Sequence, residues 1–341
     1  MAPARRESNP LRWTRVCRTV RNTCILAAAE LLLVSASLPR GRSERLDLFP
    51  KLRVSQTVSY YVSYHAEKFV TTESPVVSSA PADNAAAEVH ALLRFEVLDL
   101  QSRGDRSVIH ARTYFDTLNS DWHPTIPDLK PPDPETQLER LGKPIDFVIF
   151  PDGRIEDVVG LEALSADEQQ AWRGWAARFA SGSVFPRAIK ISQKFKSEEA
   201  ESSPSPIEGL RWIRESRYVR DEPCRSISIS ARGDLAPSEA APEKCAVILT
   251  DATLKQKSSP QNATPQAFQV RELRTAGKAG GTNRIIAYIS RKTGLLVHST
   301  EEANQTMDVT VEKTDGSNRV HYAVKAKSRC EILLVTETTL N

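Results

Sequence analysis

The sequence predicts a mainly β protein of the α+β class, a curved antiparallel sheet or half-barrel with one or two packed helices. Three observations predict this fold. Several segments alternate apolar and polar side chains with the two-residue period of a half-buried strand. Clusters of turn-forming residues separate these segments at short intervals. One segment, 165–181, has the spacing of an amphipathic helix instead.

The first predicted strand opens the body of the chain. Serine, threonine and histidine occupy one side of it, and the other side is apolar. A strand with one apolar and one polar face is typical of antiparallel sheets that have one side in water. The apolar positions are Val54, Val58, Tyr60, Val62 and Tyr64.

A second strand pair is predicted over residues 89–97 and 108–115, with a turn at 102–105. Residues 71–87, which precede this pair, hold few large apolar side chains and predict a loop. Residues 121–134 contain five prolines. Because each proline removes a backbone donor, this segment predicts a connection rather than a central strand.

The middle of the chain adds a hairpin and a helix. Residues 145–159 predict a hairpin that turns at Pro151-Asp152-Gly153, after a short helix capped by Asp133. The helix at 165–181 begins with a capping box formed by Ser165 and Glu168. Its aromatic stripe predicts a face that packs on the core rather than a ligand site. The stripe consists of Trp172, Trp175 and Phe179.

The second half of the sequence is predicted to be almost entirely β. Met307, Val309 and Val311 are expected to pair with Val320, Tyr322 and Val324 across a turn at 314–318. Loops rich in Pro, Ser, Glu and Ala are expected at 196–207, 232–243 and 257–266. Further strands are predicted at 184–195, 210–219, 226–230, 245–255, 284–290, 295–300 and 330–335.

Residues 1–37 have the order of a secretory signal peptide. Six arginines precede or border an apolar run from Cys24 to Ala36, and small residues at 34–37 offer a cleavage site. Glu30 opposes insertion of this run, and an amphipathic helix of a cytosolic protein is the alternative. The run is too short to span a bilayer, so no membrane span is expected in the mature chain. We therefore expect export to the periplasm or the extracellular space, with residues 38–341 as one large β-rich domain.

The cysteines leave two alternatives. Cys17 and Cys24 lie in the leader, and Cys224, Cys245 and Cys330 lie in the body. In an oxidising compartment the shortest closure is a disulfide between Cys224 and Cys245. Otherwise all three are buried thiols that act as small apolar side chains.

Charge excludes one class of partner. The chain carries a net charge of +3, but residues 1–37 hold six arginines against two glutamates, which leaves a net charge of −1 on the rest. Nucleic-acid binding normally needs a dense basic face. The body has none, so no nucleic-acid partner is expected.

No catalytic, cofactor-binding or metal-binding motif is found in the sequence. None of the six histidines has a metal-ligand spacing. The pair Gly280-Gly281 is expected to lie in a small, flexible stretch that lacks the strand–glycine–helix context of a phosphate site. His110, on a predicted strand, and His123, beside Asp121, are the two histidines that merit examination as catalytic residues. Neither has a partner in the sequence that points to a reaction.

The order of the parts resembles a family of uncharacterised exported bacterial β proteins that are similar to the lipoprotein-carrier half-barrel. A tyrosine-rich strand at 58–64 comes first, then the hairpin FVIFPDGRIEDVVG, a strand with Trp212, and a final hairpin of the type YISRKTGLLVHS. The resemblance covers residues 47–335. It implies a curved antiparallel sheet with helices against its concave side, and it supplies no catalytic residues.

Three functions are compatible with these observations. The first is a non-enzymatic exported protein that binds a lipid or another apolar ligand in the concave face of the sheet. The second is an interaction or assembly protein of the cell envelope, which would use strand edges or the long loops. The third is a hydrolase built around His110 or His123.

Overall fold

The computed structural model of the chain divides into two units, Met1–Glu44 and Arg45–Asn341, and all the described residues belong to the second unit. The predicted helix at 165–181 falls outside them apart from Gln169, as do the leader and the predicted helix that Asp133 would cap. The described residues are 45–46, 48, 50–73, 80–103, 106–124, 142–150, 155–162, 164, 169, 189–191, 193–201, 205–230 and 234–336.

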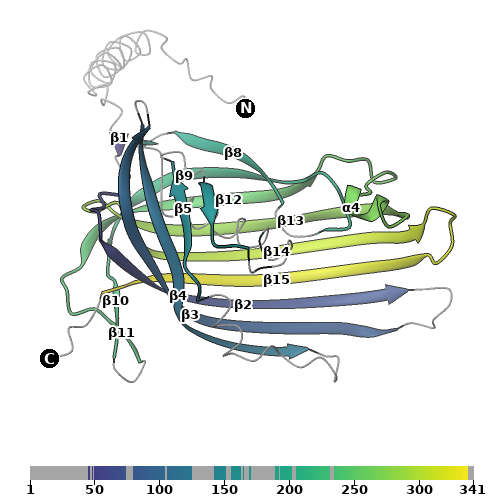
Figure 1. Ribbon diagram of the computed structural model, residues 1–341, viewed down its shortest axis with the longest axis horizontal. Coiled ribbons are helices and arrows are strands. Elements are labelled where there is room, and N and C mark those ends of the chain that lie inside the picture. The colour runs from purple at the N-terminus through teal and green to yellow at the C-terminus, as the bar shows by residue number, and fades with distance from the viewer. Residues whose placement is uncertain are drawn as a thin grey trace, which may run out of the picture. The chain divides into compact units, whose positions relative to one another are not determined.

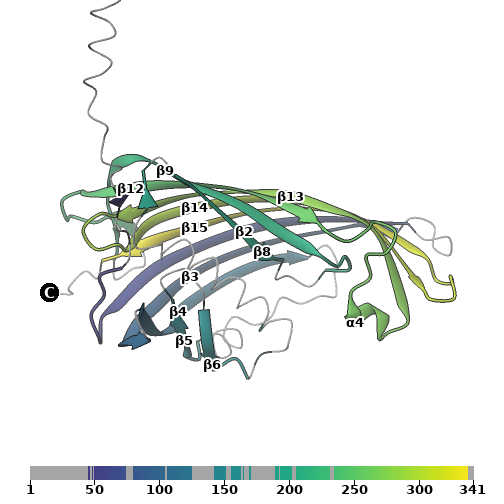
Figure 2. The same ribbon diagram turned by 90° about the horizontal axis from the view of Figure 1, so that it is seen from above.

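One large antiparallel sheet makes up most of this unit (Figure 1), and its long strands bow together when seen from above (Figure 2). Its strands, in the order in which they pair across the sheet, are β6 (Ile155–Val159), β5 (Ile145–Ile149), β4 (Arg106–Pro124), β3 (Ala80–Arg103), β2 (Thr57–Glu73), β15 (Val320–Val335), β14 (Leu296–Lys313), β13 (Leu273–Ser290), β12 (Glu243–Gln256), β9 (Leu210–Cys224) and β8 (Lys194–Ala200).

Four short strands and one helical turn complete the described elements. β10 pairs with β11 in an antiparallel manner and touches β15 through Ile227 and Val335, and β1 pairs with β7. The sheet is open, because its two ends, β6 and β8, are not paired with each other. The elements are β1 (Arg45–Leu46), β7 (Ile189–Lys190), β10 (Ile227–Ile229), β11 (Leu235–Pro237) and α4 (Gln266–Gln269).

The sheet joins the two ends of the described chain. β2 and β15 lie side by side as the purple and yellow strands of Figure 1, paired from Glu73 with His321 to Ser59 with Val335. The register of the last hairpin confirms its prediction, because Met307 lies opposite Val324 and Val311 opposite Val320. The mainly β fold class is therefore confirmed.

One face of the sheet, which we name the inner face, carries two apolar clusters. The larger includes Tyr60, Leu93 and Ile289, and burial raises the pKa of Tyr60. The smaller lies toward the other ends of the strands and includes Trp212 and Val309. The strand alternation predicted from the sequence puts these side chains on one face.

The predicted start of the first strand was wrong by a few residues. Val54 is exposed and precedes β2, because the chain turns at Arg53–Gln56 with Ser55 in the left-handed region at a φ of 63°. Val58, Tyr60 and Val62 are buried on the inner face as predicted.

The predicted loop at 71–87 is largely strand. β2 continues to Glu73 and β3 starts at Ala80, so that Ala85 pairs with Lys68 and Ala87 with Ala66. This part of β3 also pairs with β4. The two flanking strands supply the backbone hydrogen bonds that small side chains with low β propensity do not secure alone.

The first four residues of the predicted proline-rich connection are strand, and residues 125–134 lie outside the described residues. Residues 121–124 belong to β4, which ends at Pro124. β5 pairs with β4 from Ile109 to Thr113, so among the described strands the later part of β4 has β3 as its partner. A proline is tolerated there because an edge strand leaves one side of its backbone without ladder bonds.

The prediction that Gly280-Gly281 lies in a flexible stretch was wrong, because both residues are inside β13. A Cβ atom on Gly277 would lie 2.2 Å from the backbone oxygen of Asp308, and one on Gly281 would lie 2.6 Å from that of Asn304. Glycine lets the backbones of β13 and β14 approach closely at these two positions.

Three other boundaries differ from the predictions because neighbouring strands extend the pairing. The strand predicted at 184–195 is divided between β7 and β8, and β8 then runs to Ala200, into the loop predicted at 196–207. The loop predicted at 232–243 contains β11, whose backbone pairs with β10. The loop predicted at 257–266 does lie outside the strands over residues 257–265, and α4 follows it from Gln266.

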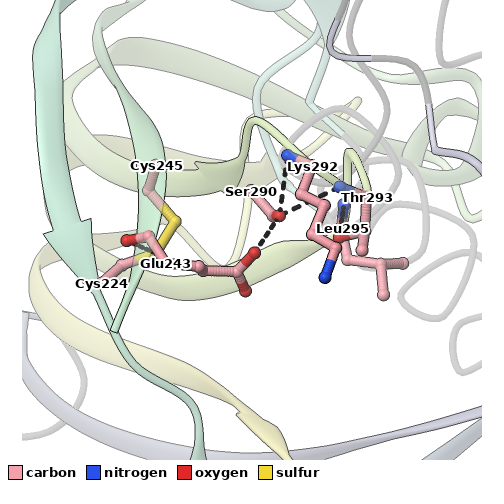
Figure 3. The surroundings of a disulfide bond; sticks show 7 residues. All are labelled: Cys224, Glu243, Cys245, Ser290, Lys292, Thr293 and Leu295. Atoms are coloured by element: carbon pink, nitrogen blue, oxygen red, sulfur yellow. Dashed lines mark hydrogen bonds between the residues drawn. A yellow bond between two sulfur atoms is a disulfide. The ribbon is translucent and has the colours of Figure 1, made fainter. Parts of the chain in front are cut away.

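A disulfide joins β9 to β12 at one end of the sheet (Figure 3). The Cα atoms of Cys224 and Cys245 are 5.7 Å apart, and Cys245 is fully buried. Beside it, the buried hydroxyl of Ser290 donates to the carboxyl of Glu243 and accepts from the backbone N–H of Thr293. These contacts fix the turn between β13 and β14 against the start of β12.

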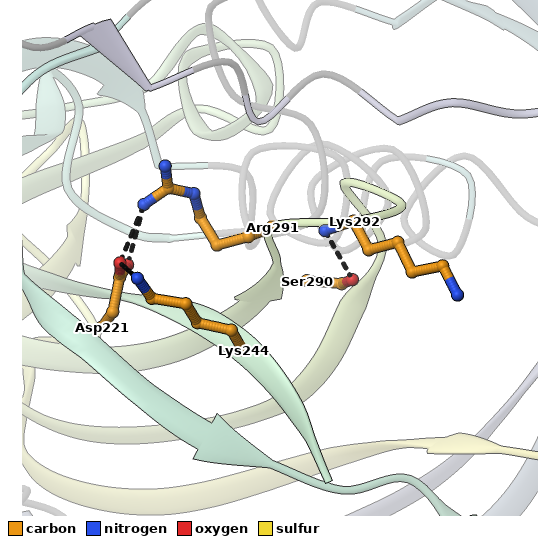
Figure 4. A network of polar contacts seen from close by, with 5 residues as sticks. All are labelled: Asp221, Lys244, Ser290, Arg291 and Lys292. Carbon is orange, nitrogen blue, oxygen red and sulfur yellow. Dashed lines mark hydrogen bonds and ion pairs between the residues drawn. The ribbon is translucent and has the colours of Figure 1, made fainter. Parts of the chain in front are cut away.

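An ion cluster lies at the same end (Figure 4). Asp221 of β9 accepts from Arg291 and Lys244, each at 2.9 Å. Burial alone would raise the pKa of Asp221, but the hydrogen bonds from Lys244 and Arg291 outweigh it and lower that pKa below its usual value of 3.8. The cluster ties β9 and β12 to the turn that follows β13 with charge-assisted hydrogen bonds.

Replacement of both Cys224 and Cys245 by alanine is expected to lower the free energy of unfolding by about 3 kcal/mol, because the disulfide closes a loop with a sequence separation of 21. Urea unfolding with and without reductant measures this loss. Cys330→Ala serves as the control and should leave the effect of reductant in place. A wild-type midpoint that reductant does not change would contradict the expectation.

Asp221→Asn is expected to destabilise the protein by about 1–2 kcal/mol at pH 7. A lowered folded-state pKa gives stability above the unfolded value near 3.8, and this stability is lost as the pH falls through the folded value. The difference between wild type and variant should therefore shrink from pH 7 to pH 2.5 in urea unfolding. Asp251→Asn, at the more exposed pair with Arg284, should change little at either pH.

Thr275→Val is expected to raise the free energy of unfolding by about 1 kcal/mol, because its buried hydroxyl has no hydrogen-bond partner among the described residues. Thr264→Val should instead cost about 1–3 kcal/mol, since the Thr264 hydroxyl donates to the Thr275 carbonyl and accepts from the Thr275 N–H. Thermal and urea unfolding compare the two. Equal losses in both variants would count against this explanation.

Candidate functional site

A row of small side chains crosses the inner face between the two apolar clusters. The register places Ala252, Asn283, Ala303, Ser328 and Ala66 opposite one another on five successive strands. Closely packed interiors need large side chains to fill the space above a sheet. A row of alanine and serine therefore leaves a hollow where the larger side chains of the two clusters end.

The hollow has a volume of about 300 Å³. It lies over β2, β15, β14 and β13, and Trp212 of β9 contributes to its wall. Ligand pockets occupy roughly 300–1,000 Å³, so this one is at the lower end. Its lining residues are Tyr64, Ala66, Glu67, Lys68, Trp212, Asn283, Ile285, Leu296, Ser299, Glu301, Ala303, Gln305, Ala326, Lys327, Ser328, Cys330 and Ile332.

The β2–β15 side of the hollow has an apolar part, beside the polar residues Glu67, Lys68, Lys327 and Ser328. Tyr64 lies opposite Cys330 in the register, and Ile332 is the next inner-face residue of β15. Ala66 and Ala326 continue this side toward the smaller cluster. Side chains of this kind fit a hydrocarbon chain, because its burial removes apolar surface from water.

The β13–β14 side carries the polar atoms. The Asn283 Nδ2 atom donates to Glu301 Oε1 at 2.5 Å. At the far end, Glu201 accepts from Trp212 Nε1 at 2.8 Å and from Gln305 Nε2 at 3.5 Å. These donors of the wall are thus already directed at carboxyl oxygens.

Asn283 leaves one acceptor unused. The residue is only 5% exposed, and its Oδ1 atom has no hydrogen-bond partner among the described residues. The bond from Nδ2 to Glu301 sets the orientation of the amide, since the opposite orientation would bring two acceptor oxygens together. A buried polar atom without a partner costs about 1–3 kcal/mol, so it calls for an explanation.

The two histidines singled out in the sequence do not lie close enough to share one site. His110 and His123 both lie on β4, thirteen residues apart, which corresponds to roughly 40 Å of extended strand. The side chain of His123 falls outside the described residues. The described part of the chain holds no group of three or more His, Cys, Asp or Glu residues that could bind a metal ion.

One histidine network lies on the opposite, outer face. The Tyr61 hydroxyl is 2.7 Å from His90 Nδ1, and His90 Nε2 is 3.0 Å from Glu88. Burial, followed by the charges of Glu331 and Glu88, raises the pKa of Tyr61. The contact between Tyr61 of β2 and His90 of β3 links the two strands across the outer face.

The sequence prediction missed the residues of the hollow. A signal for them exists, because Ala66, Ala303, Ala326 and Ser328 occupy inward positions of strands whose other inward positions are larger. Small side chains alone do not reveal a hollow, since it forms only when the register brings them into adjacent rows.

Comparison with protein-family models finds no match for this chain, and comparison with curated proteins finds none either. Solved structures give distant similarities. A candidate lipoprotein from Parabacteroides distasonis ATCC 8503 is 6% identical with a TM-score of 0.25, and the match covers 82% of this chain and 98% of that one.

Two further structures match over the same share of this chain. A candidate exported protein with a YmcC-like fold from Bacteroides fragilis NCTC 9343 is 7% identical, with a TM-score of 0.21 and 97% of its own chain covered. OpdL of Pseudomonas aeruginosa is 8% identical, with a TM-score of 0.19 and 99% covered. None of the described helical segments is long and apolar enough to cross a membrane.

Proposed function

We propose that this protein is exported and binds a single-chain apolar or amphipathic molecule in the hollow of the inner face. The observation that carries the proposal is the hollow itself, about 300 Å³ between two apolar clusters with an apolar part and a polar side. Pockets with mainly apolar walls and a few convergent polar groups are the usual form of small-molecule sites. The volume fits one hydrocarbon chain better than a two-chain lipid.

Export is supported by two features of the chain. The arginine-rich start, the apolar run and the small residues at 34–37 follow the order of a signal peptide. The disulfide between Cys224 and Cys245 is a bond that persists mainly in oxidising compartments.

A role in envelope assembly is the alternative proposal. The charged side chains of the β8 edge disfavour strand pairing with a partner at that edge. Lys194, Lys196 and Glu198 alternate with other residues along β8, and Glu198 pairs with Arg211 across to β9. Charged side chains on an edge strand discourage pairing with another chain. Cross-linking in cells tests the alternative, which requires a specific partner.

Ala303→Trp is expected to fill the hollow and weaken binding of the neutral dye N-phenyl-1-naphthylamine by about tenfold or more, because apolar burial of the dye is lost. Dye fluorescence measures the binding. Asn304→Trp is the matched control, since Asn304 is the next residue of β14 and is exposed on the outer face. Equal binding by both variants, or no dye binding and no co-purifying lipid in the wild type, would refute the proposal.

The alkylation rate of Cys330 gives an independent measurement of binding, because its thiol lines the hollow. Bound dye is expected to slow alkylation of Cys330 by iodoacetamide in the wild type, as followed by mass spectrometry of the peptide that contains it. The same dye should give no protection in the Ala303→Trp variant.

A further inference from the structure

We infer that the side chain of Gln305 closes one end of the hollow and sets the longest hydrocarbon chain that the hollow accepts. This inference rests on the proposed function and adds a length limit to the class of ligand, a single-chain amphiphile. It follows from a second cavity, which lies on the same face of the sheet beyond Gln305.

The second cavity is small and has an apolar side. Its volume is about 60 Å³, several times the roughly 10–15 Å³ that one water molecule needs. Glu201 and Ser205 contribute to its wall. Its apolar lining residues are Leu210, Leu254, Ala279, Met307, Val324 and Ala326. The cavity therefore has room for a short piece of hydrocarbon chain, whose burial there is favourable.

Gln305 lies between the two cavities and lines both of them. Its row on the inner face follows the row of small side chains and precedes the row of Met307. On β13, β14 and β15, only Gln305 has a side chain larger than a methyl group in its row. Gln305 is therefore the barrier over these three strands. On five successive strands the row consists of Leu254, Gly281, Gln305, Ala326 and Lys68.

Hydrogen bonds hold this barrier in place. The Nε2 group of Gln305 donates to Glu201 at 3.5 Å, and the same carboxyl accepts from Trp212 Nε1 at 2.8 Å. A Cβ atom on Gly281 would lie 3.2 Å from Gln305 Cγ, so the side chain lies close to the backbone of β13. A hydrocarbon chain that pushed Gln305 aside would bring apolar surface against the polar groups of Gln305 and Glu201, which is unfavourable.

The opposite end of the hollow is closed by the larger apolar cluster. Leu296 lines the hollow there and is 1% exposed, and Ile289 of the same cluster is fully buried. Closely packed side chains leave no space for additional methylene groups. A longer chain can therefore gain burial along the strands only by passing Gln305.

Alkyl maltosides with tails of eight, ten, twelve, fourteen and sixteen carbons test this inference, because they share one neutral head group. Each is titrated below its critical micelle concentration against N-phenyl-1-naphthylamine bound to the wild-type protein. We expect the affinity to rise about three- to fourfold with each added methylene until the tail reaches Gln305, and to stay constant for longer tails.

Gln305→Ala should move this limit to longer tails by two or more methylenes, so that the longest probe binds about tenfold more tightly than it binds to the wild type. The eight-carbon probe should bind equally to both proteins. Asn304→Ala, on the outer face, is the matched control and should leave the limit unchanged. Gln305→Thr also shortens the side chain and suits a strand, so it provides the test if Gln305→Ala fails to fold.

A second substitution locates the added part of the tail. Ala279 lines the second cavity but not the hollow. Ala279→Leu, introduced together with Gln305→Ala, should fill the second cavity and restore the length limit of the wild type. A limit that stays at the longer tails in this double variant would refute the assignment to the second cavity.

The outcomes separate the two proposals. A wild-type affinity that keeps rising up to sixteen carbons, or the same limit in the wild type, Gln305→Ala and Gln305→Thr, would overturn the role of Gln305 and leave the binding function intact. Failure of the dye and of all five maltosides to bind the wild type would overturn both.

Discussion

The pairing of β2 with β15 is the constraint on which the rest of the structure depends. It brings the first long strand of the described chain beside the last one and joins β6–β5–β4–β3–β2 to β15–β14–β13–β12–β9–β8 in one sheet of eleven successive strands. Because the side-chain period of a strand is two, a slip of β2 by one residue against β15 would turn Tyr60 toward the outer face while Ile332 stayed on the inner face. Both apolar clusters and the hollow between them require this one register.

The hollow forms because the large side chains of the two apolar clusters do not cover the middle of the sheet. Tyr60, Leu93 and Ile289 fill the space over one end of the sheet, and Trp212 and Val309 fill it over the other. Between them, the middle row of the inner face presents Asn283, Ala303, Ser328 and Ala66. Gly277 and Gly281 of β13 contribute in the backbone, since they let β13 and β14 lie closer than side chains would allow. The result is a sheet that is filled at both ends and open in the middle.

Covalent and ionic contacts hold the end of the sheet where the strands β9, β12 and β13 meet. The disulfide, the Ser290 hydroxyl and the Asp221 cluster all connect segments that belong to different strands. They lie at one end of the strands, beyond the larger apolar cluster, whereas the hollow lies in the middle.

The sequence by itself determined the class of fold and much of the strand pattern, because alternation of apolar and polar residues is a local property that a single segment displays. Val58, Tyr60 and Val62, and the pairing of Met307 with Val324, were predictable for this reason. Only the tertiary structure decided that alanine and glycine segments such as 80–87 and 276–281 are strand, since neighbouring strands supply their hydrogen bonds. It also decided the hollow, because Ala66, Asn283 and Ser328 are far apart in sequence and meet only through the register of the sheet.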